Sequence, residues 1–219
     1  MKRFDCRAVV FDLDGVLVDS TGYVEMQWRR WATSKGLPVE PFLRVCHGRR
    51  ALETIRLAAP HLDAEAEVAA FVPGEDDPVL TPVEGAVRLL DALPVGSWAV
   101  ATSGTRPVAT ERLRRAGLPI PGVLICAEDV VRSKPCPDVY LLAAAGLGVG
   151  PTECLVVEDA PAGIEAARAA GMKVIALTTT HPPKELAVDT CTASLAGIHV
   201  GRITEDAGQR RMIELLVVA

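Results

Sequence analysis

Two aspartates stand two positions apart in the stretch VVFDLDGVLVDS, residues 9–20, directly after an apolar run. They are Asp12 and Asp14, and only Gly15 separates them from the next apolar residues. Carboxylates bind divalent cations, and they can also act as nucleophiles. A pair of them at the end of a buried strand therefore indicates a chemical site rather than a simple turn.

Further polar residues occur at or just after other apolar runs of the sequence. They are Thr102 and Ser103, Lys134, and Glu158 with Asp159. Side chains at the carboxyl ends of strands in an open parallel sheet converge on one crevice, where ligands bind. Taken singly, each residue has an ordinary explanation as a turn former, a packing choice or a surface charge. Together they supply carboxylates for a cation, a hydroxyl and an ammonium for phosphate oxygens, and a carboxylate nucleophile.

The elements that would hold these residues alternate between strand and helix. Apolar runs without alternation predict buried strands, and they lie at 8–11, 98–102, 123–126, 154–158 and 173–177. Stretches that begin near a proline and stop at a glycine predict helices, and they lie at 107–117, 137–148 and 161–171. This alternation predicts an α/β fold with a doubly wound, Rossmann-like parallel sheet.

One segment interrupts the alternation, because no convincing strand lies between Asp19 and about Thr81. It holds helical stretches instead, at 22–36, 49–59 and 63–72, followed by a Pro/Asp-rich linker at 73–82. We therefore expect an all-helical cap at residues 19–81, inserted into a core of residues 1–18 and 82–219. A last strand is expected within 188–201, and the pattern after Arg202 is ambiguous.

The composition and charge of the chain limit the kinds of molecule that it is expected to bind. The chain has 219 residues, 49% of them hydrophobic, and a net charge of -5 without long basic runs, so binding of nucleic acid is not expected. The apolar run at 141–149 is too short to span a bilayer, and Asp12 and Asp14 break the apolar stretch near the N-terminus. We expect a cytoplasmic protein, a monomer or weak homodimer, without membrane contact.

Four ordered motifs resemble those of the haloacid dehalogenase superfamily, in particular its phosphatases with a small helical cap. The motifs are VVFDLDGVLVDS, VATSGT (100–105), RSKPCPDVY (132–140) and LVVEDAPAGIEAARAAGM (155–172). Together they cover nearly the whole expected core, and the helical insert lies where that family places its cap. The resemblance is nearest to the sugar-phosphate phosphatases, which implies a small phosphorylated metabolite as substrate.

The resemblance also implies roles for the strand-end residues. Asp12 would attack phosphorus to form an aspartyl-phosphate, and Asp14 would protonate the leaving alcohol and then activate water. Mg²⁺ would bind Asp12, the backbone carbonyl of Asp14, and Asp159, with Glu158 bound directly or through water. The phosphoryl oxygens would be held by Lys134, Thr102 and the N–H groups of Ser103 and Gly104.

Three other functions compete with that of a phosphatase. Haloacid dehalogenases lack an acid/base aspartate at the position of Asp14, which argues against carbon–halogen chemistry. A phosphosugar mutase would use the same core, but mutases carry a histidine at the position of Val24. A phosphate-binding domain without turnover has little support, because every catalytic group is present.

Substrate selection should depend on the cap, where the sequence says least. Arg49 and Arg50 open a predicted helix, and one of them could reach a phosphate or hydroxyl across the crevice, or both could lie on a solvated helix face. Of the two, we take Arg49 as the candidate substrate-binding residue. Tyr23, Trp28 and Trp31 have helical spacing, which favours a role in the cap core over a sugar-stacking platform. Ser133 replaces a glycine that often precedes the motif lysine in this superfamily.

Overall fold

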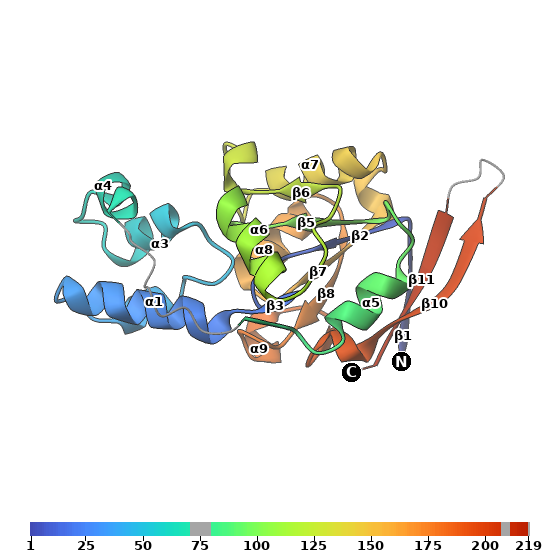
Figure 1. Cartoon of the computed structure of the whole chain (residues 1–219), viewed down its shortest axis with the longest axis horizontal. Helices are drawn as coiled ribbons and strands as arrows, with labels where there is room; N and C mark the ends of the chain where they lie inside the picture. Colours follow the sequence, from blue (N-terminus) through green and yellow to red (C-terminus); the bar gives the residue numbers. More distant parts are fainter. Residues whose placement is uncertain (71–79, 207–210, 219) are drawn as a thin grey trace.

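The computed structural model describes residues 1–70, 80–206 and 211–218. At its centre lies a parallel sheet of six strands in the order β6-β5-β2-β7-β8-β9 (Figure 1). The strands are β2 (Ala8–Phe11), β5 (Trp98–Ala101), β6 (Leu124–Ile125), β7 (Cys154–Glu158), β8 (Lys173–Leu177) and β9 (Cys191–Thr192). The predicted α/β class with a parallel sheet is confirmed.

Helices cover both faces of this sheet, which explains why its strands are apolar without alternation. Ala8 and Val10 of β2 face α7 (Asp138–Leu147) and α8 (Pro161–Ala169) in one buried cluster. Val9 and Phe11 face the opposite way, into a cluster that includes residues of α5 (Ala86–Ala92) and α6 (Arg106–Arg115). Alternate residues of one short strand thus belong to two separate cores.

The five predicted strands and three predicted core helices all occur, with ends that differ by one or two residues. The strand expected at 123–126 is the shortest, with only Leu124 and Ile125 in the sheet. Two core helices were not predicted, α5 and the short α9 (Pro183–Leu186). Both are brief, and neither shows more than two turns of helical periodicity.

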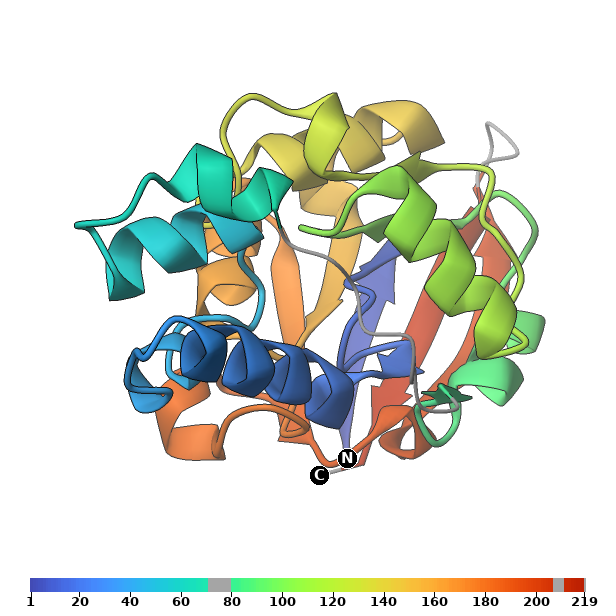
Figure 2. The same cartoon turned by 60° about the vertical axis from the view of Figure 1, so that its left-hand side comes forward.

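A second sheet was not predicted at all. It is antiparallel, has the order β1-β11-β10, and consists of β1 (Lys2–Cys6), β10 (Ile198–Glu205) and β11 (Arg211–Val217). The last strand expected within 188–201 is therefore two elements, β9 and the start of β10. Ile213, Leu215 and Val217 bury one face of the second sheet in the same core as Phe11. Figures 1 and 2 show the chain ends side by side next to it.

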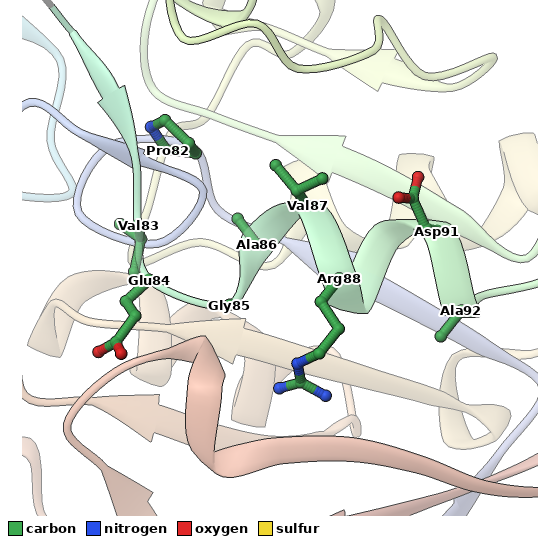
Figure 3. A pocket seen from close by; sticks show the side chains of 9 residues that line it. All are labelled: Pro82, Val83, Glu84, Gly85, Ala86, Val87, Arg88, Asp91 and Ala92. Carbon is green, nitrogen blue, oxygen red and sulfur yellow. The ribbon is translucent and has the colours of Figure 1, made fainter.

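Arg88 of α5 connects the second sheet to the core. Its Nη2 donates to the carbonyls of Leu195, Ala196 and Ile198 at 3.1–3.3 Å. Figure 3 shows this side chain directed from α5 toward the segment that leads into β10. A cavity of 780 Å³ lies here, lined only by residues of α5 and the segment before it. Its lining includes none of the strand-end residues.

The helical insert contains α1 (Thr21–Ser34), α2 (Glu40–Leu43), α3 (Ala51–Ala58) and α4 (Ala64–Ala69). In Figures 1 and 2 these helices lie to one side of the parallel sheet. They have a core of their own, in which Trp28 stacks on Phe42 with ring centroids 5.6 Å apart. Trp28 and Trp31 are buried in this core, as their spacing indicated, whereas Tyr23 packs against the core of the parallel sheet.

A two-stranded antiparallel pair lies where the insert leaves the rest of the chain, between β3 (Val18–Asp19) and β4 (Thr81–Pro82). The predicted domain boundaries at 18/19 and 81/82 fall within this pair, and the division into two domains stays a prediction. Most of the predicted linker, and the end of the helix predicted at 63–72, lie outside the described residues. Within the described part of the chain, no helix has the length and hydropathy needed to cross a membrane.

Candidate active site

The carboxyl ends of β2, β5 and β7 are neighbours in the sheet, and the structure brings the predicted residues together there. Asp12 follows β2, Thr102 follows β5, and Glu158 ends β7. All three are buried, as are Lys134 and Asp159. Strand order alone therefore collects groups that lie more than 140 residues apart in the sequence.

The Lys134 ammonium lies at the centre of this group. Its Nζ donates to Asp12 Oδ1 at 2.6 Å, to Glu158 Oε1 at 2.7 Å and to the Ala101 carbonyl at 3.2 Å. Burial acts to lower the pKa of Lys134, but the charges of Asp12 and Glu158 outweigh it and raise that pKa well above its usual value. Lys134 is therefore a buried positive charge held between two carboxylates.

Glu158 uses both of its oxygens inside the protein. Oε1 accepts hydrogen bonds from Lys134 and from the Tyr140 hydroxyl at 2.8 Å, and Oε2 accepts from the N–H groups of Asp159 and Ala160 at 2.8 and 2.9 Å. Burial acts to raise the pKa of Glu158, but Lys134 and these hydrogen bonds lower it overall. Glu158 is thus a charged residue that holds its neighbours in place.

Three carboxylates, those of Asp12, Glu158 and Asp159, place oxygen atoms within 4.8 Å of one another. Burial, assisted by the neighbouring carboxylates, raises the pKa of Asp12 to about 7 and that of Asp159 well above its usual value. One ammonium does not balance three buried carboxylates. The possible metal ligands are all carboxylate oxygens, and together they carry more negative charge than Lys134 neutralises. They therefore fit a hard divalent cation such as Mg²⁺.

Gly15 is required by the close approach of Asp159. It has a φ of +79°, and a Cβ at this position would lie 2.1 Å from Asp159 Oδ2. Two threonines complete this side of the site: Thr179 Oγ1 donates to the Gly15 carbonyl and Thr180 Oγ1 to the Asp159 carbonyl, each at 2.6 Å. Sequence reasoning missed both threonines, although they come two and three residues after the predicted strand at 173–177.

Asp14 lies at the edge of the site, with a side chain that is 24% exposed. Its Oδ1 accepts a hydrogen bond from Ser20 Oγ at 2.6 Å and lies 2.5 Å from Nη1 of Arg112 on α6. Arg112 was not among the predicted site residues. Its own stretch, TERLRRAG, gives no signal that distinguishes it from the arginines beside it.

The residues predicted to hold phosphoryl oxygens form a tight turn after β5. Thr102 Oγ1 accepts the Gly104 N–H at 3.0 Å, and Ser103 Oγ donates to the Gly48 carbonyl of the cap at 2.9 Å. The Thr102 hydroxyl proton and the Ser103 N–H are the groups left for an anion. Their contact with phosphate stays a prediction.

The loop before α3 and the first turn of α3 attach the helical insert to the rest of the protein. Arg50 Nη2 donates to the carbonyls of Ala127 and Val130 at 2.7 and 2.8 Å, and Ser133 Oγ donates to Glu53. Arg50 is thus occupied by the core, while neighbouring Arg49 makes no ion pair or side-chain hydrogen bond among the described residues. Ser133, which departs from the glycine common in the superfamily, adds a contact that glycine lacks.

The chain is similar in sequence and in fold to known hydrolases. The sequence profile of the haloacid dehalogenase-like hydrolases matches residues 6–171. Hexitol phosphatase A of Escherichia coli is 42% identical over 207 residues, 89% of this chain and 94% of its own. Glycerol-1-phosphate phosphohydrolase 2 of Saccharomyces cerevisiae is 36% identical over 211 residues, 89% of this chain and 84% of its own. A hydrolase from Pseudomonas syringae shares the fold, with a TM-score of 0.74 at 24% identity, over 86% of this chain and 94% of its own.

Proposed function

Because the chain belongs to the haloacid dehalogenase-like hydrolases, we propose that it hydrolyses phosphate monoesters of small polyols or sugars. The observation that carries this proposal is the buried Lys134 ammonium held between Asp12 and Glu158. A positive charge next to a candidate nucleophile is what an incoming phosphate dianion requires. Relatives named as phosphatases of hexitol and glycerol phosphates support the substrate class.

In the proposed reaction, a carboxylate oxygen of Asp12 attacks phosphorus while the bond between phosphorus and the alcohol oxygen breaks. Asp14 gives its proton to the departing alcohol. Water then attacks the phosphorus of the aspartyl-phosphate and gives a proton to Asp14, which releases inorganic phosphate and restores Asp12. The two carboxylates flank a bend at Leu13, directly after β2.

Mg²⁺ would be held by Asp12, Asp159 and the backbone carbonyl of Asp14, and would supply the charge that offsets repulsion between phosphate and carboxylates. Glu158 would assist through water, because both its oxygens already accept hydrogen bonds within the protein. Lys134, Thr102 and the N–H groups of Ser103 and Gly104 would hold the phosphoryl oxygens, and Gly104 would exchange its bond to Thr102 for one to the substrate.

Residues 19–81 would act as a cap that closes the crevice during the reaction. The contacts of Ser103 with Gly48, and of Arg50 with the core carbonyls, support a closed position in this structure. The short β3–β4 pair would be the hinge, since no other paired strands connect the insert to the core in the described residues. Arg49, with no ion pair or side-chain hydrogen bond there, is the cap residue proposed to reach the substrate.

The alternatives are weaker. Asp14 argues against a dehalogenase, as it did from the sequence. A phosphosugar mutase would place a histidine at position 24, but Val24 is an apolar residue packed against the cap core. A domain that binds phosphate without turnover would not need the buried set of Asp12, Asp14 and Lys134.

A panel of polyol and sugar phosphates, assayed for released phosphate with and without Mg²⁺, tests the proposal. Hydrolysis should require the metal and should disappear in Asp12→Asn, because an amide oxygen is a poor nucleophile. Circular dichroism checks that the variant stays folded. Turnover by a folded Asp12→Asn, or full activity in excess chelator, would rule out the mechanism.

A further inference from the structure

Arg112 touches the acid/base carboxylate from the core and a cap side chain at the same time. We propose that it is a positioning residue, which aims Asp14 at the leaving alcohol and couples that aim to the cap through Tyr23. This inference rests on the proposed phosphatase function and deepens it. It assigns a role to a residue of α6 that lies outside all four sequence motifs.

Two groups of the protein contact one oxygen of the Asp14 carboxylate. Ser20 Oγ and Arg112 Nη1 both approach the same oxygen, Oδ1, at 2.6 and 2.5 Å. Within the described residues, no hydrogen bond reaches Oδ2. The hydrogen bond from Ser20 and the charge of Arg112 restrain the carboxylate at Oδ1 and leave Oδ2 without a hydrogen-bond donor, which is what proton transfer to a substrate atom needs.

Arg112 also contacts a side chain of the first cap helix. The Arg112 guanidinium lies 5.9 Å from the centroid of the Tyr23 ring, within the range of a cation–π contact. Tyr23 belongs to the first turn of α1, and Ser20 is the residue that precedes this helix. Both groups that hold Asp14 Oδ1 therefore depend on where α1 begins, one directly and one through Tyr23.

The burial of the Arg112 side chain also supports this role. The Arg112 side chain is only 13% exposed, whereas Arg114, two residues away on the same helix, is exposed. Keeping a guanidinium away from water costs free energy unless its charge is matched. Asp14 provides that match, so the charge of Arg112 is committed to the acid/base residue rather than to solvent.

Leaving groups of different quality test the role. An alkyl phosphate such as glycerol 1-phosphate releases an alkoxide that needs a proton, whereas p-nitrophenyl phosphate releases a stable phenolate that does not. The ratio kcat/KM reports the steps up to the release of the alcohol. Arg112→Met should lower kcat/KM for the alkyl ester by about tenfold or more and for the nitrophenyl ester by less than about threefold, because general acid catalysis matters only for the first.

Matched variants separate positioning from packing. Arg112→Lys keeps the charge and should restore part of the lost rate on the alkyl ester, while Arg114→Met should change neither substrate. Tyr23→Leu should show the same selective loss as Arg112→Met in weaker form, and Tyr23→Phe, which keeps the ring, should not. Asp14→Asn should show the selective loss at its largest. If Arg112→Met does not fold, the two Tyr23 variants decide the question.

Equal losses on both esters would overturn the inference, because they would show that Arg112 acts on folding or on cap closure. A gain in rate on the alkyl ester would also overturn it, since the ion pair would then restrain Asp14. Selective loss in Tyr23→Phe would exclude the ring contact as the link. Failure of the wild-type protein to hydrolyse either ester would instead refute the proposed function, and the inference with it.

Discussion

Gly163 lies so close to the Glu158 carboxylate that a Cβ at position 163 would be 1.6 Å from Glu158 Oε1. Glu158 is completely buried and cannot swing into solvent. A side chain at position 163 must therefore displace the same oxygen that accepts from Lys134 and Tyr140. The first turn of α8 thus controls the position of the Lys134 ammonium.

Gly163→Ala should lower the rate by about a hundredfold or more, the scale of losing one preorganised charge. It should also destabilise the fold by about 1 to 3 kcal/mol, as overpacking of a core does. Phosphate release and urea unfolding measure the two effects. Gly122→Ala is the matched control, because nothing lies within 4 Å of a Cβ there. A Gly163→Ala protein with normal rate and stability would contradict the close approach.

Asp159→Asn should raise the thermal stability of the protein in chelator at pH 7.5. The folded state holds a proton on Asp159 above its usual pKa, because burial and the neighbouring carboxylates disfavour the charge. The unfolded state gives up that proton near pH 4. Between about pH 4 and the raised pKa of Asp159, the unfolded state binds fewer protons than the folded state. The free energy of unfolding of the wild-type protein therefore falls as pH rises through this range. Asparagine has no proton to lose, so Asp159→Asn does not show this fall.

Thermal unfolding at pH 4 and pH 7.5 measures the effect. In a protein of this size, each kcal/mol gained in the free energy of unfolding raises Tm by roughly 2 to 4 °C. The advantage of Asp159→Asn should be absent at pH 4. It should reverse in Mg²⁺, because the wild-type protein then gains stability from binding. Exposed Asp91→Asn serves as the control. Equal stability of wild type and Asp159→Asn at both pH values in chelator would argue against a charge penalty at this site.

Lys134→Met should lose both activity and stability. It removes the only ammonium that contacts Asp12 and Glu158 in the described chain, and leaves buried carboxylates without a counter-charge. Breaking a buried ion pair costs about 3 to 5 kcal/mol, and the rate should fall about a hundredfold or more. Denaturant unfolding and phosphate release provide the measurements, with exposed Lys184→Met as the control. An unchanged rate would remove Lys134 from the mechanism.

Arg49→Ala and Arg50→Ala should differ in their kinetics. Arg49→Ala should raise KM for a sugar or polyol phosphate far more than for p-nitrophenyl phosphate, because a contact with the non-reacting part of the substrate is lost. Arg50→Ala should affect both esters alike, because it detaches the cap loop from Ala127 and Val130. Steady-state kinetics on the two esters decide between them. Equal losses on both esters in Arg49→Ala would mean that it serves the phosphoryl group or cap closure.

The sequence predicted most of the site because the polar residues interrupt buried strands. Asp12, Thr102 and Glu158 stand where apolar runs end, and parallel strand order brings such ends together. Lys134 was predicted with them, since it is part of a motif that follows the third strand. At β8 the same rule points to Thr178, whereas the threonines that contact the site are the next two, Thr179 and Thr180.

Other features depend on contacts between elements far apart in the sequence. Arg112 has the same local surroundings as Arg114, and only the placement of α6 beside Asp14 distinguishes the two. β1 carries only Phe4 and Cys6 as apolar residues, and its partner β11 lies about 200 residues further along the chain. The choice between Arg49 and Arg50 depended on which of them the core carbonyls would occupy. Periodicity within a short window contains no information on any of these contacts.

The position of β11 between β1 and β10 has a consequence for synthesis of the chain. β1 is translated before the strands of the parallel sheet, yet its pairing partner Arg211–Val217 follows about 200 residues later. At about 5–20 residues per second, a ribosome needs roughly 10–40 s to cover that distance. Throughout that interval β1 has no strand to pair with in the second sheet. The second sheet can therefore close only after the segments that form the candidate active site have already been translated.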